Sequence, residues 1–387
     1  MSSASYFSSL IPELVSDIAA YFDSEQLFSL RLCNGHLCAC TRRIFIRRYF
    51  HKRTHLLTQR SLECLLDISR DPVLGPAVQE LVVSRRTIRG SDDDEAVQRY
   101  RAEMEFLNAS GLVTTYLTQV LQNAPGCRTV VLDDRCKNPW GESAFKSKAY
   151  KRGGLFPFPI QPRNRMESFL CRDLVRSIIF AVANSNIAIR TLDLASHKIS
   201  AIEQPSALQP HECYERSLAR SQWTKTLTTL RLKVVIGDEL VPGTPAAVVA
   251  DFINRFPNLE ELYLDLFKVR VEPDAAARSF HKLIRRLQRK ARLHTLTLVN
   301  VRFRLEDLTA LFRAHRNTLR TIELRYVYCR PEPSSSLSAS FRKMVKDELQ
   351  QIKRFTALCS DLGISVNRYY PYPDDTDMCV DYLRPVE

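Results

Sequence analysis

The sequence has no run of eighteen apolar residues, so it contains no segment of the kind that crosses a membrane as a helix. The first ten residues, MSSASYFSSL, lack a basic region ahead of an apolar stretch, which argues against a secretory signal. The 11 cysteines are scattered without regular pairing, and this favours reduced thiols over a disulfide framework. Together these absences predict a cytoplasmic or nuclear protein that does not enter a membrane.

Motifs of nucleotide-binding proteins and hydrolases are absent as well: there is no GxxxxGK[ST], GxGxxG or GxSxG. The stretch HECYE has Glu215 at the position where a zinc protease needs its second histidine. Cys38 and Cys40 are too close for a structural zinc site, and Cys33 and Cys40 fit the apolar positions of a helical core. We therefore expect no catalytic residues, no metal and no cofactor.

The composition is that of an ordinary globular chain, with 45% hydrophobic and 26% charged residues and a formal net charge of +13. The basic residues concentrate in three segments, 42–53, 146–152 and 281–292. Basic surfaces attract phosphates and acidic partners, whereas most charged runs are solvated helix faces. Solvated faces are the simpler interpretation for these segments.

A hexamer of the form L-x-x-L-x-L recurs along the chain. Clear copies are LTTLRL, LEELYL, LHTLTL and LRTIEL, with IRTLDL nearly the same and weaker copies ahead of them. The copies end at Val83, Leu132, Leu194, Leu232, Leu264, Leu298 and Leu324. The later spacings approach the period of leucine-rich repeats, about 20–29 residues.

Each hexamer ends in the apolar–polar alternation of a strand, and helical patterns lie between the copies. These helical segments are 169–185, 246–256, 275–291 and 304–315. The unit is thus a helix, a turn and a strand, which buries its apolar side only by stacking on its neighbours. The fold class expected is α/β: an irregular solenoid over residues 76–360, with parallel strands on the concave face and helices outside.

An ordinary α/β domain with a parallel sheet is the alternative to a solenoid. The first leucine of each hexamer favours the solenoid, because it supplies an inward contact that a plain strand does not need. The Asn or Cys that usually follows the strand of a leucine-rich repeat is missing in most copies, and Asn300 comes one position early. The predicted array is therefore irregular.

Two segments, 133–166 and 195–226, lack helical or strand patterns and are predicted insertions. The first mixes aromatic and basic residues, so Trp140 and Tyr150 are candidates for partner contacts, with simple packing onto the solenoid as the alternative. A long helix is predicted from Leu337 to Leu358, followed by a C-terminal tail, 361–387. Residues 51–75 are predicted to form a linker helix region.

The N-terminal fifty residues read as three short helices. Pro12 suits the first turn of a helix, and Asp23-x-x-Gln26 resembles a capping box that starts a second one. Apolar residues follow at helical spacing. So small a unit leaves an apolar edge unburied, and such edges mark interaction sites.

This segment, residues 1–50, resembles the F-box, the adaptor-binding module of SCF-type ubiquitin ligases. The family pattern is matched at Leu10, Glu13, Leu14, Ile18, Phe22, Leu27, Leu30, Arg31 and Leu32. Cys33 replaces the usual valine, and Pro12 stands one residue late. An F-box followed by leucine-rich repeats is the layout of F-box/leucine-rich-repeat substrate receptors, and irregular versions look like those of filamentous fungi. A helical cap on the first repeat is the alternative.

The resemblance implies a non-catalytic substrate receptor for protein ubiquitination. An exposed edge would bind a Skp-type adaptor and, through it, a cullin–RING ligase; its residues would be Leu10, Pro12, Glu13, Leu14, Ile18, Leu27 and Leu30. The solenoid would bind an unknown target protein. The alternatives are an F-box scaffold that holds a partner without ubiquitination and a basic nucleic-acid-binding solenoid that uses residues 285–292.

The residues between the last two apolar positions of four hexamers would point away from the core. They are Arg231, Tyr263, Thr297 and Glu323. Their alternation with buried leucines makes them the predicted target-recognition surface.

Overall fold

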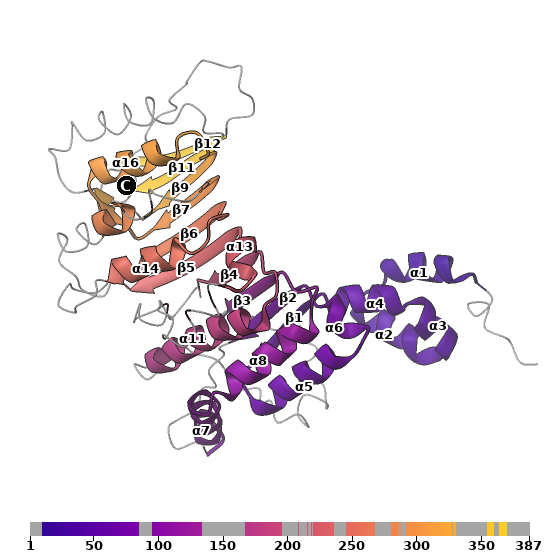
Figure 1. Ribbon diagram of the computed structural model, residues 1–387. Helices are drawn as coiled ribbons and strands as arrows, with labels where there is room; N and C mark the ends of the chain where they lie inside the picture. The colour runs from indigo at the N-terminus through magenta and orange to yellow at the C-terminus, as the bar shows by residue number, and fades with distance from the viewer. Residues whose placement is uncertain are drawn as a thin grey trace, which may run out of the picture.

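The computed structural model describes residues 10–84, 95–133, 167–195, 220–235, 245–267, 280–285, 292–326, 328–329, 354–359 and 364–369, with the single positions 208, 215, 218 and 287. Figure 1 shows a helical N-terminal unit joined to a sheet with helices packed along it. The sheet has ten strands, and it is open at both ends.

Strands and helices alternate through most of this chain. The helices are α1 (Pro12–Ala20), α2 (Ser24–Cys33), α3 (Gly35–Cys40), α4 (Arg42–Tyr49), α5 (Gln59–Arg70), α6 (Leu74–Ala77), α7 (Glu95–Ala109), α8 (Leu112–Asn123), α11 (Glu167–Ser185), α13 (Trp223–Thr226), α14 (Pro245–Ile253) and α16 (Leu305–His315). The main sheet is built from β1 (Lys52–Leu56), β2 (Glu80–Ser84), β3 (Thr129–Asp133), β4 (Thr191–Leu194), β5 (Thr229–Val235), β6 (Glu261–Phe267), β7 (Thr295–Val299), β9 (Thr321–Arg325), β11 (Arg354–Cys359) and β12 (Ile364–Tyr369). A separate pair is formed by β8 (Arg302–Phe303) and β10 (Tyr328–Cys329).

The strands of the main sheet lie side by side in chain order. Every neighbouring pair from β1 to β11 is parallel, and only β12 runs antiparallel, against β11. The predicted α/β class with a parallel sheet is thus confirmed. Each hexamer contributes a strand that starts at its third residue, and the residue in the first hexamer place is buried in every copy, as Leu227 and Leu259 illustrate.

One backbone pattern sets the stagger of successive strands. The carbonyl oxygen of His51 accepts hydrogen bonds from the backbone N–H groups of both Gln79 and Glu80, just ahead of β2. The same arrangement recurs at the start of β3, β4, β5, β6, β7 and β9, and the accepting carbonyls belong to Gln79, Arg128, Arg190, Thr228, Glu260 and His294. Each strand is therefore positioned by the carbonyl group that precedes its neighbour.

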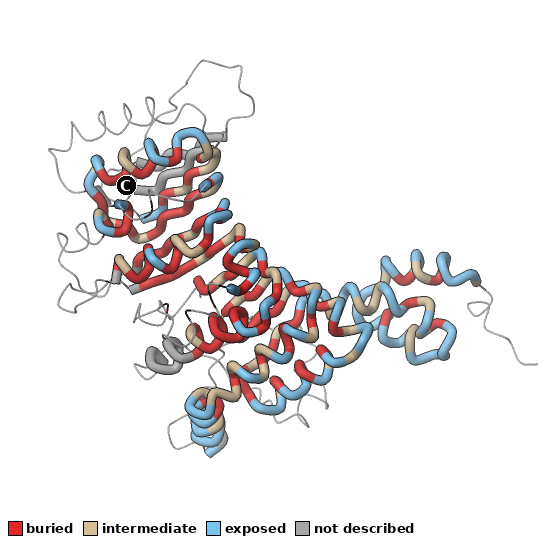
Figure 2. The backbone as a smooth tube through the Cα atoms, viewed as in Figure 1, coloured by how far each residue is buried: buried red, intermediate tan, exposed pale blue. Residues whose placement is uncertain are grey.

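One face of the sheet is packed against helices, including α5, α8, α11, α14 and α16 (Figure 1). In β2 to β7 and in β9, the alternate residues that point to this side are apolar and buried, and they join the helices in a single continuous core. Figure 2 shows this core as a red band along the strands and the adjoining helix faces. The opposite face carries the other alternate residues, which are mostly polar from β4 to β9, and we call it the polar face.

The sheet begins earlier than the sequence predicts, because β1 lies in the segment expected to be a linker helix region. Its two inward residues are Arg53 and His55, which pair in register with Leu81 and Val83 of β2. Because both of its core positions are polar, β1 lacks the apolar–polar alternation by which the other strands were predicted. The rest of the segment is helical, as expected, in α5 and α6.

The N-terminal unit has four helices instead of three. The predicted third helix is interrupted at Thr41, which separates α3 from α4 and whose hydroxyl donates to the carbonyl oxygen of Leu37 at 2.7 Å. The other local predictions are confirmed. Pro12 is the first residue of α1, and Asp23 and Gln26 form a reciprocal capping box at α2.

The C-terminal part differs from the prediction. The end of the long helix expected from Leu337 to Leu358 is instead strand β11, and the tail contains β12, which pairs with it. The rest of that predicted helix lies outside the described residues. The second predicted insertion ends in the short helix α13, whose Trp223 is fully buried, so this part of it belongs to the core.

None of the helices that the structure describes combines the length and the apolarity that a membrane crossing needs.

Candidate interaction surfaces

The N-terminal unit carries most of the exposed large apolar side chains. Six of the nine in the described part of the chain lie on or beside α1 and α2: Ile11, Leu14, Ile18, Tyr21, Phe28 and Leu32. Four of them are spaced three or four residues apart and so share one side of α1, and we call this set, Ile11, Leu14, Ile18 and Tyr21, the α1 stripe. Its exposed fractions run from 37% for Ile18 to 90% for Tyr21.

A small core holds α1 in place behind its stripe. Val15 and Ala19 of α1 are fully buried, as is Leu27 of α2, and Leu37 of α3 is nearly so. The guanidinium group of Arg48 on α4 donates hydrogen bonds to the carbonyl oxygens of Ala20 and Phe22 at the end of α1. The stripe is therefore presented on a helix that is fixed from behind.

An aromatic cluster joins α2 to α4. The ring of Phe45 lies 5.5 Å from Phe28 and 4.9 Å from Tyr49, measured between centroids. The Arg31 guanidinium carbon lies 4.0 Å from the centroid of the Phe45 ring, and Arg31 also donates to the carbonyl oxygen of Cys38 at 2.9 Å. This cation–π contact and hydrogen bond fix α2, α3 and α4 relative to one another.

The predicted adaptor-binding residues fall into three groups. Pro12, Glu13, Leu14 and Ile18 are exposed, and Leu10 and Leu30 are half-buried. Leu27 is fully buried, so its placement on an exposed edge is wrong: it is a core residue. The predicted adaptor-binding edge does not include Ile11, Tyr21, Phe28 or Leu32. Leu32 belongs to the F-box pattern only, and the spacing of Ile11 and Tyr21 from Leu14 and Ile18 could have indicated those two residues.

The four residues predicted to recognise a target form one row across the polar face. Arg231 pairs in register with Tyr263, Tyr263 with Thr297, and Thr297 with Glu323. Asp193 of β4 continues the row, opposite Arg231. We call these five residues, Asp193 to Glu323, the charged ladder.

Contacts within the charged ladder order its side chains. Arg231 Nη1 lies 3.4 Å from Asp193 Oδ2, and the Arg231 guanidinium carbon lies 4.7 Å from the centroid of the Tyr263 ring. Glu323 accepts from Arg325 and lies 3.5 Å from the Thr297 hydroxyl. Burial raises the pKa of Tyr263, and the negative charge of Asp265 adds to this effect.

A second polar pair lies two residues further along β5 and β6. Lys233 of β5 is opposite Asp265 of β6, and both are largely buried. The Asn300 side-chain amide donates to Asp265 Oδ1 at 2.7 Å. Burial raises the pKa of Asp265, whereas this hydrogen bond and Lys233 lower it. The sequence interpretation did not include these residues, because they lie beyond the hexamer.

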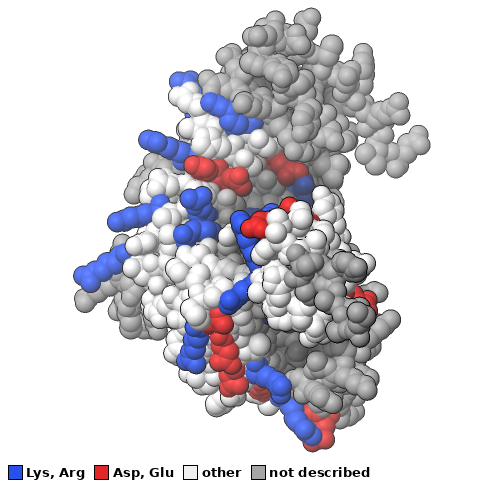
Figure 3. All heavy atoms as spheres, turned by 90° about the vertical axis from the view of Figure 1, so that its right-hand side faces the viewer, with Lys and Arg blue, Asp and Glu red and all other residues white. Residues whose placement is uncertain are grey.

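Acidic and basic side chains occur together on the side of the molecule drawn in Figure 3, and basic ones stand out along one edge. The charged ladder itself contains two carboxylates and one guanidinium group. Nucleic-acid binders concentrate positive charge on one face, so this row does not have their pattern. Within the basic segment 281–292, the described residues Arg285 and Arg292 are exposed.

Trp140 and Tyr150, the candidate contact residues of the first predicted insertion, fall outside the described residues. Cys33 is exposed and Cys38 and Cys40 are half-buried, so the prediction that Cys33 and Cys40 occupy a core is wrong. In the described part of the chain no three His, Cys, Asp or Glu residues come close enough to hold a metal ion.

No model of a known protein family matches this chain, and a search among curated proteins finds no match.

Proposed function

We propose that this protein is a substrate receptor of an SCF-type ubiquitin ligase, built from an N-terminal F-box and an irregular leucine-rich-repeat solenoid. The α1 stripe carries the proposal, because a fixed helix with four exposed large apolar residues is suited to docking against a partner helix. In this proposal the partner is a Skp-type adaptor, which links the chain to a cullin–RING ligase.

The leucine-rich-repeat part of the proposal is supported by the order of the strands and by the repeated carbonyl pattern. Parallel strands in chain order, each preceded by a buried residue in the first hexamer place, are what stacked helix–strand units produce. In this assignment the polar face binds the target protein. In this proposal the protein is not itself a catalyst; it acts by raising the effective concentration of a target near the ubiquitin-conjugating enzyme.

The first experiment is co-purification with the Skp-type adaptor of the source organism. The double variant Leu14→Asp with Ile18→Asp should lower adaptor affinity by at least about a hundredfold, because it places two charges in an apolar contact. Both side chains are already exposed, so the fold should be retained. Phe106→Asp is the matched control: Phe106 is 58% exposed on α7, far from this stripe in the chain.

Adaptor binding that survives in the double variant would contradict the proposal and favour a helical cap on the first repeat. Recruitment of a cullin to the purified complex separates a ubiquitin ligase from a non-ubiquitinating scaffold.

The recognition surface is tested by replacing Arg231, Tyr263, Thr297 and Glu323 together with alanine. Cross-linking to targets should fall, and undiminished cross-linking would move the target site off the charged ladder.

A further inference from the structure

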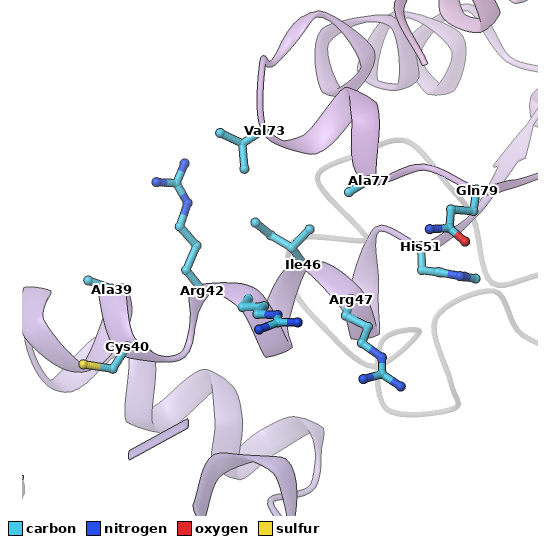
Figure 4. A pocket seen from close by; sticks show the side chains of 10 residues that line it. Ala39, Cys40, Arg42, Ile46, Arg47, His51, Val73, Ala77 and Gln79 are labelled. Atoms are coloured by element: carbon cyan, nitrogen blue, oxygen red, sulfur yellow. The ribbon is translucent and has the colours of Figure 1, made fainter. Parts of the chain in front are cut away.

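A groove of about 550 Å³ lies where the N-terminal helical unit meets the first units of the sheet. One wall is formed by the end of α3, by α4 and by His51; the other is formed by Val73, Ala77 and Gln79 around α6. In Figure 4, Arg42 and Ile46 extend from α4 towards Val73 and Ala77. The volume falls within the range of roughly 300–1,000 Å³ that is usual for binding pockets.

The groove is strongly basic. Arg42, Arg43, Arg47 and His51 line it, and no carboxylate does. Among the described residues no hydrogen bond or ion pair holds Arg43 or Arg47, and both are exposed. Outside the lining, the carboxylate of Asp71 interacts with Arg42. Arg43 and Arg47 therefore place positive charge at the groove without a partner among the described residues.

The remaining lining favours a peptide over a nucleic acid. Ala39, Ile46, Val73 and Ala77 are small or aliphatic, and no aromatic ring apart from the His51 imidazole faces the groove. Single-stranded nucleic acids need aromatic platforms on which their bases stack. Aliphatic side chains instead suit the apolar residues of a peptide that also carries carboxylates.

The spacing of the arginines matches an extended acidic peptide. Arg43 and Arg47 are one helical turn apart, about 5–6 Å. Alternate residues of an extended chain lie about 6.6 Å apart on one side. Two carboxylates at alternate positions can thus reach both guanidinium groups on α4, while the residues between them point to the other wall, towards Val73 and Ala77.

We propose that this groove binds a short extended segment of a partner protein in which acidic residues alternate with aliphatic ones. The groove uses α3, α4 and the region of α6, whereas the α1 stripe lies on another helix. Binding here is a second interaction, separate from the proposed adaptor contact.

Fluorescence anisotropy with the full chain tests this proposal, using a labelled peptide of alternating glutamate and valine. The probe should bind at low ionic strength, and its glutamine analogue should not. Arg43→Ala with Arg47→Ala should weaken binding roughly tenfold, because two charge-assisted contacts are lost. Arg285→Ala with Arg292→Ala removes the same charge elsewhere and should leave binding unchanged.

The proposal would be overturned if the glutamate probe did not bind, or if the two double-arginine variants weakened its binding equally. It would also be overturned if binding of a labelled single-stranded RNA depended on Arg43 and Arg47 while binding of the peptide did not. Far-ultraviolet circular dichroism should be unchanged, because the two side chains make no described contacts that hold the fold. The Leu14→Asp, Ile18→Asp variant should bind the probe normally, so failure of the adaptor proposal is distinguishable from failure of this one.

Discussion

At the scale of single residues, the most unusual feature is the pair of polar side chains in the core positions of β1. His55 Nδ1 lies 3.0 Å from the carbonyl oxygen of Ser61, and Arg53 Nη2 lies 3.4 Å from His55 Nε2. The neutral imidazole fits both contacts, since it donates from Nδ1 and accepts at Nε2. Burial, and then the charge of Arg53, lower the pKa of His55 from 6.5 to about 3.

This depressed pKa predicts a loss of stability in mild acid. The unfolded chain binds a proton at His55 below pH 6.5 and the folded chain only near pH 3, so the free energy of unfolding falls as pH drops through this window. Between about pH 7.5 and pH 5 the loss should be about 1–2 kcal/mol. Urea denaturation at a series of pH values measures it.

His55→Gln is the control for this prediction, because glutamine keeps a hydrogen-bonding side chain but does not titrate. The variant should be less stable at neutral pH and should lose less stability on acidification than the unmodified chain. An equal acid loss in both proteins would show that other groups account for it.

At the scale of elements, α6 is held against its neighbours at the distance that a glycine allows. A Cβ atom on Gly75 would lie 2.1 Å from the carbonyl oxygen of Ser69 at the end of α5 and 3.0 Å from that of Asn123 on α8. Both neighbours are backbone atoms, which cannot turn away as a side chain can. The packing of three helices therefore depends on the absence of one methyl group.

Gly75→Ala should lower the free energy of unfolding by roughly 1–3 kcal/mol or more, because the helices must move apart. Gly35→Ala is the matched control, since nothing lies within 4 Å of its Cβ position and alanine favours the helix. Thermal denaturation of the two variants beside the unmodified chain gives the comparison. A Gly75 variant as stable as the Gly35 variant would contradict this account of the packing.

The polar face could be predicted from the sequence, because successive side chains of a strand point to opposite faces of the sheet. Once the leucines are assigned to the core, the residues between them must lie on the other face. Helical periodicity was less decisive on α1. Val15 and Ala19 point inward there, while the larger Leu14 and Ile18 point outward. Both pairs are apolar at helical spacing, and only the positions of the neighbouring helices decide which pair is covered. Leu27 was misplaced for the same reason.

At the scale of the whole molecule, the helical unit and the sheet have separate cores. Val15, Ala19, Leu27 and Leu37 are buried in the unit, and none of them belongs to the continuous core of the sheet, 57–324. Arg53 links the two parts, because its guanidinium group donates to the carbonyl oxygen of Tyr49 at 3.1 Å from its place in β1. The two parts should therefore differ in local stability.

Leu27→Ala should destabilise the helical unit by about 2–5 kcal/mol, the usual cost of a leucine cavity, and leave the sheet unaffected. Hydrogen exchange followed by mass spectrometry should show faster exchange in 10–49 and unchanged exchange in β5, β6 and β7. Leu32→Ala is the control, because Leu32 is 85% exposed. Faster exchange throughout the sheet in the Leu27 variant would mean that the two cores unfold as one.

The repeated carbonyl pattern has an evolutionary consequence. Successive accepting carbonyls are 28 residues apart between His51 and Gln79 in the chain and 62 apart between Arg128 and Arg190, yet the pairing at the strand starts is the same. Lengthening a connection costs little closure entropy, about 0.6 kcal/mol for each doubling. Lineages of this protein are thus free to gain or lose sequence between strands, and new recognition segments can arise there without a change in the scaffold.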